Sequence, residues 1–448
     1  MRINPFKSPK VSPAKILVGG FALLIVIGTV LLSLPMAVHV GRLPLLDAFF
    51  TATSAVCVTG LVVVDTGTFF TRFGQTVILL LIQFGGLGIM TVATIIFILL
   101  GKKISLRERL VIQEAMNEET LQGLVHLVRT VVLMTLSIEV VGALVLSTRF
   151  IPIYGWRTGL FYSAFHAISA FCNAGFDIIG GYRSLTPFTS DPVIVFTIVI
   201  LFIVGGIGFS VLVECYRRRR FARLSLHGKM VIGITLVLLL FSTILILVIE
   251  YNNPATLGQH GTLGKVMNAF FTAATPRTAG FNTVNTGQLF RPTLFFVILL
   301  MFIGASPAST GGGIKTTTFG TLILTVLAAV RGDEDVLLYK KRIPLDILRK
   351  ALSITVLGLL LISMVTFALL LTESGTFTFL DYLFEATSAF GTVGLSTGVT
   401  TTLSVWGRLL IIITMFAGRV GPLTLVFALA HHKHKAPLQY VSERIMIG

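Results

Sequence analysis

Apolar residues along the chain gather into long runs that short polar segments separate. The longest runs are Ile16–Leu34, Val77–Leu100, Val193–Val213, Met230–Ile249 and Ile354–Leu371. An α-helix needs about 20 apolar residues to cross the hydrocarbon core of a bilayer, and each run approaches or exceeds this length. The pattern predicts an all-α polytopic membrane protein. The first run lacks a small-residue cleavage site, which favours a retained helix over a signal peptide.

Composition and charge fit this class and predict its orientation. Of the 448 residues, 54% are hydrophobic and only 12% are charged, against about 25% in soluble domains. The net charge of +16 does not indicate nucleic-acid binding, because the basic residues cluster between apolar runs. By the positive-inside rule these clusters are cytoplasmic, which places both termini in the cytoplasm of a multi-pass cell-membrane protein. Membrane lipid is an expected partner. The clusters are Lys7/Lys10/Lys15, Lys102/Lys103/Arg107/Arg109, Arg217–Arg220 with Arg223 and Lys229, Lys340–Arg342 with Arg349/Lys350, and Lys433/Lys435.

One segment is repeated four times without a gap. The copies are DAFFTATSAVCVTGL ending at Leu61, YSAFHAISAFCNAGF ending at Phe176, MNAFFTAATPRTAGF ending at Phe281, and DYLFEATSAFGTVGL ending at Leu395. About a dozen residues precede each glycine, roughly 18 Å of helix, which is too short to span a bilayer. Each copy therefore reads as a re-entrant pore helix and loop between two spanning helices, eight spanning helices in all. Non-helical backbone at membrane depth must line water or protein, so we expect the four loops to converge on one central pore.

The loops carry the chemistry of a cation filter. Glycine can adopt a positive φ and turn its carbonyl toward the axis, so four copies could form a ring of oxygens that replaces an ion's hydration shell. The predicted potassium ligands are the carbonyls of Gly60, Gly175, Gly280 and Gly394. The candidate filter residues are Val58, Thr59, Gly60, Leu61, Asn173, Ala174, Gly175, Phe176, Thr278, Ala279, Gly280, Phe281, Thr392, Val393, Gly394 and Leu395.

These four glycine-centred repeats resemble the Trk/Ktr/HKT superfamily of potassium transporters over about residues 15–435. The resemblance implies one filter glycine per repeat, and the short N-terminus looks most like the membrane subunit of bacterial Ktr systems. It further implies potassium as the transported ion, sodium as a possible activator, a homodimer, and a cytosolic ring of nucleotide-binding regulatory subunits. No covalent cofactor is expected.

The second helix of the third repeat is interrupted by a polar, glycine-rich stretch. Glycine costs about 1 kcal/mol and proline about 3 kcal/mol inside a helix, so this stretch should be an intramembrane loop below the filter that obstructs the pore. A static kink is the competing interpretation. Nucleotide binding is disfavoured, because Gly-Ile-Lys departs from the P-loop sequence. The predicted gate residues are Gly304, Ala305, Ser306, Pro307, Ala308, Ser309, Thr310, Gly311, Gly312, Gly313, Ile314, Lys315 and Thr316.

Arg419 lies in an otherwise apolar run of the fourth repeat. An arginine at membrane depth is costly and usually functional. We expect it to hydrogen-bond the carbonyls of the gate loop, at the depth where the first repeat has Gly86, and not to pair with Glu385 or Asp381. The glycines at 85–88 and 205–208 read as close helix packing. Asp47 and Asp381 are expected to cap pore helices.

Other chemistry is weakly indicated. The three cysteines, Cys57, Cys172 and Cys215, show no paired spacing, and the His431–Lys435 run reads as a solvated helix end more than as a metal site. No arrangement of catalytic residues recurs in a common repeat, so an enzyme is not expected. A secondary transporter of another small solute or of sodium, and a structural scaffold, remain as alternatives. The predicted boundaries are a tail at 1–14, repeats at 15–101, 120–222, 223–331 and 343–434, linkers at 102–119 and 332–342, and a tail at 435–448.

Overall fold

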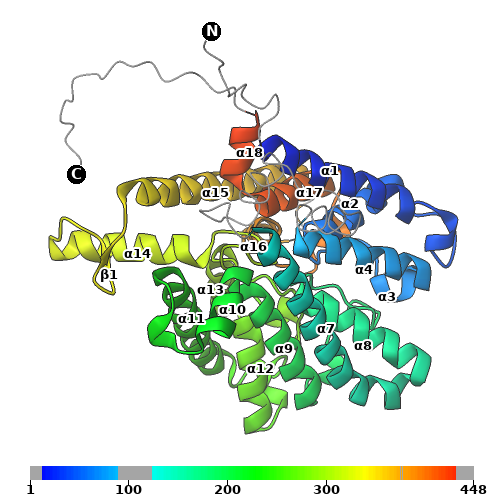
Figure 1. The fold of residues 1–448 in the computed structure, drawn as a ribbon. Coiled ribbons are helices and arrows are strands. Elements are labelled where there is room, and N and C mark those ends of the chain that lie inside the picture. The colour runs from blue at the N-terminus through cyan, green and yellow to red at the C-terminus, as the bar shows by residue number, and fades with distance from the viewer. Residues whose placement is uncertain (1–12, 89–123, 374, 376, 430–448) are drawn as a thin grey trace.

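The chain folds almost entirely into helices arranged as four similar units around a common centre (Figure 1). The computed structural model describes residues 13–88, 124–373, 375 and 377–429. The whole predicted linker 102–119, the tail 435–448 and the His431–Lys435 run therefore lie outside the described residues.

Each unit begins with a long helix, continues with a short helix and a loop, and ends with a second helix. The long helices are α1 (Pro13–Leu32), α7 (Leu124–Tyr154), α11 (Leu226–Glu250) and α15 (Leu345–Thr372). The short helices are α2 (Leu45–Val56), α8 (Trp156–Phe171), α12 (Thr262–Ala274) and α16 (Phe379–Gly391). The second helices are α4 (Arg72–Leu87), α9 (Pro192–Ile207) continued by α10 (Phe209–Arg218), α13 (Arg291–Phe302) continued by α14 (Thr316–Arg331), and α17 (Val405–Val420) continued by α18 (Pro422–Leu429).

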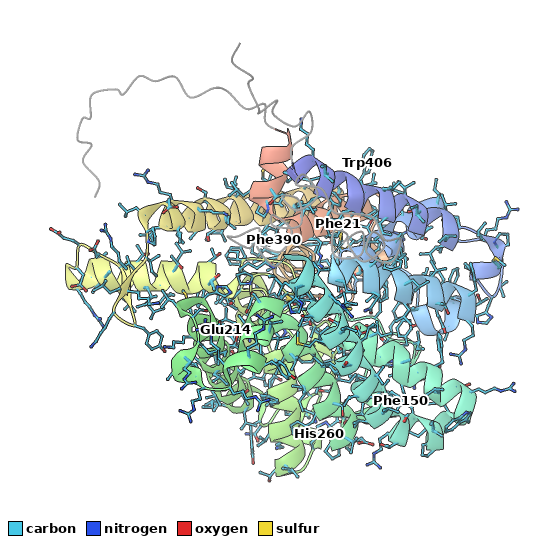
Figure 2. The ribbon with its side chains drawn as sticks, viewed as in Figure 1. Phe21, Phe150, Glu214, His260, Phe390 and Trp406 are labelled. Carbon is cyan, nitrogen blue, oxygen red and sulfur yellow. The ribbon has the colours of Figure 1, made fainter. Side chains whose placement is uncertain are left out.

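The four units form a closed ring. The second helix of each unit packs against the short helix of the next: α4 on α8, α9 on α12, α13 on α16, and α17 back on α2. The apolar side chains of the short helices fill the interior. Phe390, for example, is buried at the end of α16 and stacks on Phe302 with ring centroids 6.1 Å apart (Figure 2). This packing brings the four loops that follow the short helices toward the middle.

The long helices expose apolar side chains on the outside of the ring. Leu240 and Ile244 of α11 are more than 60% exposed, as are Met364 and Phe367 of α15. Exposed apolar surface on this scale is unfavourable in water and suits contact with lipid tails. All four long helices have the length and composition of a membrane span.

The second helices of the second, third and fourth units are interrupted. The sequence predicts eight spanning helices with an interruption in the third repeat, and it does not predict the breaks after α9 and α17. The described residues contain four uninterrupted spans, or five if α9 and α10, which are bent by 97°, are taken as one. Gly88, Gly208 and Gly421 directly follow the last residues of α4, α9 and α17, and all three glycines have positive φ. Glycine adopts this conformation without a Cβ penalty and commonly ends helices.

Part of the predicted linker 332–342 is a short β-hairpin at the end of α14. Strand β1 (Leu337–Leu338) pairs antiparallel with β2 (Lys341–Arg342), and Val336 and Ile343 pack on Ala328 beneath it. Helix α14 lies between α11 and α15, and the hairpin stands at its outer end (Figure 1). The expectation of an all-α chain is therefore nearly met, with two strands of two residues each.

Candidate functional site

The four repeated glycines meet in a closed ring. A Cβ added to Gly60 would lie 3.0 Å from the Cα of Gly175, and one added to Gly175 would lie 2.9 Å from the Cα of Gly280. The corresponding approaches are 3.4 Å from Gly280 to Gly394 and 3.1 Å from Gly394 back to Gly60. Any side chain at these positions would collide with a neighbouring unit's backbone. The ring is therefore built from backbone alone.

All four loops share an unusual backbone conformation. The ring glycines have φ between 68° and 92°, and the residue two positions earlier in each loop is also left-handed. Those residues are Val58 (56°), Asn173 (58°), Thr278 (68°) and Thr392 (50°). Positive φ is strained for β-branched residues, and such strain persists only where the surrounding structure enforces it. Two left-handed residues in alternation turn the peptide planes, so that successive carbonyls can face one side.

Hydroxyl groups at the ends of the short helices fix the loops in two different ways. In the first and fourth units a serine hydroxyl accepts a hydrogen bond from the ring glycine, and in the second and third units the hydroxyl donates to the carbonyl after the glycine. The pairs are Gly60 N to Ser54 Oγ (3.1 Å), Gly394 N to Ser388 Oγ (3.2 Å), Ser169 Oγ to Phe176 O (2.7 Å) and Thr275 Oγ1 to Phe281 O (2.6 Å). The carbonyl after the ring glycine therefore accepts a side-chain hydrogen bond in the second and third units, and the four units differ at this position.

The interrupted segment between α13 and α14 lies directly against the inner ends of three of these loops. Thr310 Oγ1 donates to Asn173 Oδ1 (3.1 Å), and Gly312 N donates to Thr392 Oγ1 (3.0 Å). A side chain at Gly311 would overlap Thr278 Oγ1. The segment thus contacts the loops of three units.

This loop is held by its own bonds and by the second unit. Ser306 N donates to Gly206 O (3.0 Å), and Phe209 N donates to Ala308 O (2.8 Å). Within the loop the hydroxyls of Ser306 and Thr316 lie 2.9 Å apart. These bonds satisfy backbone groups that a broken helix would otherwise leave unpaired at membrane depth.

Arg419 ties the loop to the opposite side of the ring. Its guanidinium donates to the carbonyl of Thr310 and to the carbonyls of Gly85 and Gly86 at the end of α4, the last at 3.4 Å. This is the contact with the loop that the sequence predicts. Lys315 bends back and donates from Nζ to Gly311 O (2.7 Å), so two cationic groups contact this loop.

The acidic residues near the pore helices have mixed roles. Asp381 forms a capping box with Thr378, as expected. Asp47 does not cap α2, because it forms an ion pair with Arg408 of α17. Glu385 accepts hydrogen bonds from Ser396 (2.8 Å) and Thr400 and is not a partner of Arg419.

Asp177 lies two residues beyond Gly175, in the loop that leads away from the ring. Its carboxylate accepts a hydrogen bond from Ile179 N (3.1 Å). The pKa of Asp177 is raised to about 6, chiefly by burial and in part by the negative charge of Asp65, against the lowering effect of hydrogen bonds from the backbone and of Arg183. The loop therefore carries an acid that titrates close to neutral pH.

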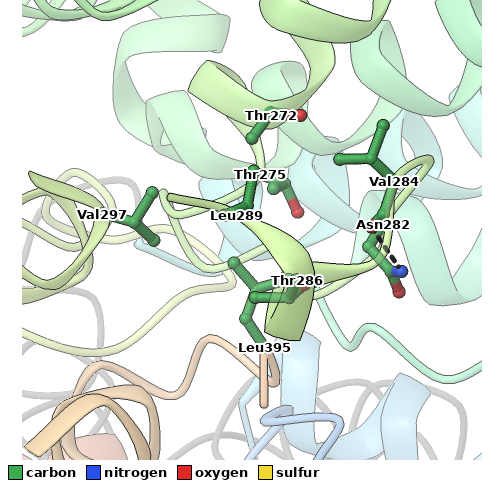
Figure 3. A pocket seen from close by; sticks show the side chains of 8 residues that line it. All are labelled: Thr272, Thr275, Asn282, Val284, Thr286, Leu289, Val297 and Leu395. Carbon is green, nitrogen blue, oxygen red and sulfur yellow. Dashed lines mark hydrogen bonds between the residues drawn. The ribbon is translucent and has the colours of Figure 1, made fainter. Parts of the chain in front are cut away.

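A small cavity lies beside the third loop (Figure 3). Its volume is about 10 Å³, and its walls come from α12, from the loop after Phe281 and from Leu395 of the fourth unit. About one water molecule needs this much room. The cavity cannot hold an organic solute.

The predicted close packing at Gly85 and Gly205 is present, because a side chain at Gly85 would overlap the carbonyl of Val56 and one at Gly205 would overlap that of Phe171.

The sequence prediction overlooked several polar contacts of this site. The amide of Asn173 bridges the third loop and the interrupted segment. Glu139, a buried acid in the apolar helix α7, accepts from Gln83 Nε2 (3.2 Å). An acid inside an apolar run was the available signal.

Four helical units around a backbone ring, with long apolar helices on the outside, fit a membrane transport protein for small cations. The TrkH family, described as cation transport protein, matches residues 14–437. The chain belongs to this family.

Similar proteins extend over nearly the whole chain. It is 48% identical over 437 residues to the Ktr system potassium uptake protein B of Bacillus subtilis, covering 98% of this chain and 97% of that protein. It is 38% identical to the potassium/sodium uptake protein NtpJ of Enterococcus hirae, covering 98% of each. The crystal structure of the potassium transporter TrkH from Vibrio parahaemolyticus shares the fold, with a TM-score of 0.73 at 18% identity over 96% of this chain and 87% of that one.

Proposed function

We propose that this chain takes up potassium across the cell membrane through a channel-like pore whose filter is the ring of glycines at 60, 175, 280 and 394. The observation that carries the proposal is the closed backbone ring itself. A Cβ added to any of the four glycines would lie only 2.9–3.4 Å from the Cα of the next glycine in the ring. Carbonyl oxygens in such a ring replace the hydration shell of the ion. Uptake then runs down the electrochemical gradient, at about 2.3 kcal/mol per charge per 100 mV.

In this proposal the loop at 304–316 and Arg419 form the gate. The loop lies against the inner side of the filter, and Arg419 holds it to the end of α4. Opening requires the loop to leave these contacts. The cationic groups of Arg419 and Lys315 raise the barrier to a cation while the loop is in place. The many specific bonds of the loop to two other units favour a gate over a static kink.

The proposed assembly follows from the relatives. A Ktr system protein B implies further subunits, so we propose a homodimer of this chain with a cytosolic ring of nucleotide-binding regulatory subunits, and both termini in the cytoplasm. Sodium activation is proposed on the same ground, together with the potassium/sodium uptake protein among the relatives. The proposed assembly and the sodium activation add to the transport proposal, and the transport proposal does not depend on either.

The alternative is a secondary transporter of another small solute or of sodium. A ring of backbone carbonyls suits a small cation, which makes sodium the stronger rival. Rubidium and sodium flux into liposomes with the purified protein separates the two cations.

The substitution Gly394→Ser tests the filter. A side chain here meets the Cα of Gly60 at 3.1 Å, so the ring must deform. We expect rubidium flux to lose its preference over sodium. Gly398→Ser is the matched control, because Gly398 has a similar φ of 105° but no neighbour within 4 Å. Unchanged selectivity in Gly394→Ser would refute the proposal.

A further inference from the structure

The side-chain amide of Asn173 is the one buried group that contacts both the filter and the gate loop through hydrogen bonds in the described residues. Its Nδ2 donates to Thr278 Oγ1 (3.0 Å) and to the carbonyl of Arg277 (3.3 Å), both at the inner end of the third loop. Its Oδ1 accepts from Thr310 Oγ1 (3.1 Å). Asn173 and Thr310 are both fully buried, so water does not compete for these bonds.

Thr310 is in turn the centre of the gate loop's attachments. Its N–H donates to Gly205 O (3.4 Å), and its carbonyl accepts from Arg419. One chain of hydrogen bonds thus runs from the third filter loop through Asn173 and Thr310 to Arg419. Movement of Thr310 removes the donor to Asn173 Oδ1 and leaves a buried amide oxygen without a partner.

We propose that Asn173 is a positioning residue that couples the gate loop to ion selectivity. This inference rests on the proposed filter and gate. With the loop in place, the Thr310 hydroxyl fixes the Asn173 amide, and the amide fixes the inner end of the third filter loop. When the loop leaves, the amide can turn, and the filter's inner end relaxes. A second link runs on the other side, where Gly312 N donates to Thr392 Oγ1 of the fourth filter loop.

The two residues can be changed with little change of shape. Thr310→Val removes the hydroxyl but keeps the backbone carbonyl that binds Arg419. Asn173→Thr removes the amide, and two other units carry threonine at the equivalent position with φ of 68° and 50°, against 58° for Asn173. The left-handed backbone is therefore compatible with the substitution.

The experiment is a double-mutant cycle in liposomes, read out as the ratio of rubidium to sodium flux. A typical buried hydrogen bond is worth about 1 kcal/mol, so Thr310→Val should lower the ratio by roughly fivefold, and Asn173→Thr, which also removes the bonds to the third loop, by at least as much. The double variant should lower it no further than Asn173→Thr alone, because Thr310 acts on the ratio through Asn173. Thr316→Val is the control, since it loosens the loop at Ser306 without touching Asn173, and it should change the total flux but not the ratio.

Two results would overturn the coupling: a Thr310→Val protein with altered flux but unchanged selectivity, or fully additive losses in the double variant. If Thr310→Val does not fold, Thr392→Val tests the second link, since Val58 occupies the equivalent position of the first unit with φ of 56°. An unchanged ratio there would count against the proposal. The filter proposal fails separately, by an unaltered Gly394→Ser. If Gly394→Ser changes the ratio of rubidium to sodium flux and Thr310→Val does not, the coupling is refuted and the filter proposal stands.

Discussion

Replacing Arg419 with alanine should open the gate. The guanidinium is the only group in the described residues that hydrogen-bonds both the Thr310 carbonyl of the gate loop and the carbonyls of Gly85 and Gly86 at the end of α4. Alanine removes this bridge and a positive charge beside the pore. The other bonds of the loop, among them those to Asn173, Thr392 and Gly206, stay in place.

The expected increase in uptake rate follows from the hydrogen bond between Arg419 and the Thr310 carbonyl, which holds the loop in place. A hydrogen bond from a charged donor contributes about 1.5–3 kcal/mol net, and 1.4 kcal/mol is a factor of ten. Losing the bond to Thr310 should therefore shift the balance between closed and open loop by roughly 10- to 100-fold. Initial rates of rubidium uptake into liposomes, without regulatory subunits, measure the shift directly.

Two further variants make the Arg419 test specific. Arg419→Lys keeps the charge but cannot bridge both partners, so its uptake rate should lie between those of the wild type and the alanine variant. Arg408→Ala, also on α17, breaks the ion pair with Asp47 and leaves the loop untouched. Its uptake rate should stay near that of the wild type. Unchanged or lower uptake by Arg419→Ala, at equal amounts of folded protein, would refute this reasoning.

Four other substitutions, one of them a control, test packing, charge and buried hydrogen bonds. Gly205→Ala should destabilise the protein by about 1–3 kcal/mol or more, seen as a lower melting temperature in detergent, because the methyl group overlaps the Phe171 carbonyl. Gly233→Ala, with nothing within 4 Å, should be neutral or slightly stabilising. Uptake should fall as the external pH drops through about 6, because protonation removes the negative charge that Asp177 carries above its pKa, and Asp177→Asn should abolish this dependence. Glu250→Gln should lower the melting temperature, with a loss of about 2–4 kcal/mol, since the carboxylate accepts four hydrogen bonds at the outer end of α11 and the amide can accept only part of them.

The repeat pattern predicts most of the fold and the position of the site. Four copies of one motif, each too short to span, predicted that Gly60, Gly175, Gly280 and Gly394 come together, and in the structure they do. The contact of Arg419 with the gate loop was also predictable, because a buried arginine needs carbonyl partners and the loop offers them. The role of these residues in ion binding and gating stays a proposal.

Other features of the site had no readable signal in the sequence. Glycines within an apolar run indicate close packing as well as a helix break, so the ends of helices at Gly88, Gly208 and Gly421 could not be separated from packing positions such as Gly85. The left-handed Val58 contradicts local preference, because β-branched residues avoid positive φ. Only the surrounding units impose it. The bridge formed by Asn173 depends on the second unit meeting two separate segments of the third unit, which no local pattern encodes.

The position of the ion itself tests the central claim most directly. Crystals of the protein grown in rubidium or thallium salts would reveal the cation by its anomalous scattering. We expect a peak on the central axis, within coordination distance of the carbonyls at residues 60, 175, 280 and 394. A bound cation found elsewhere between the helices, with nothing between these four glycines, would contradict the account.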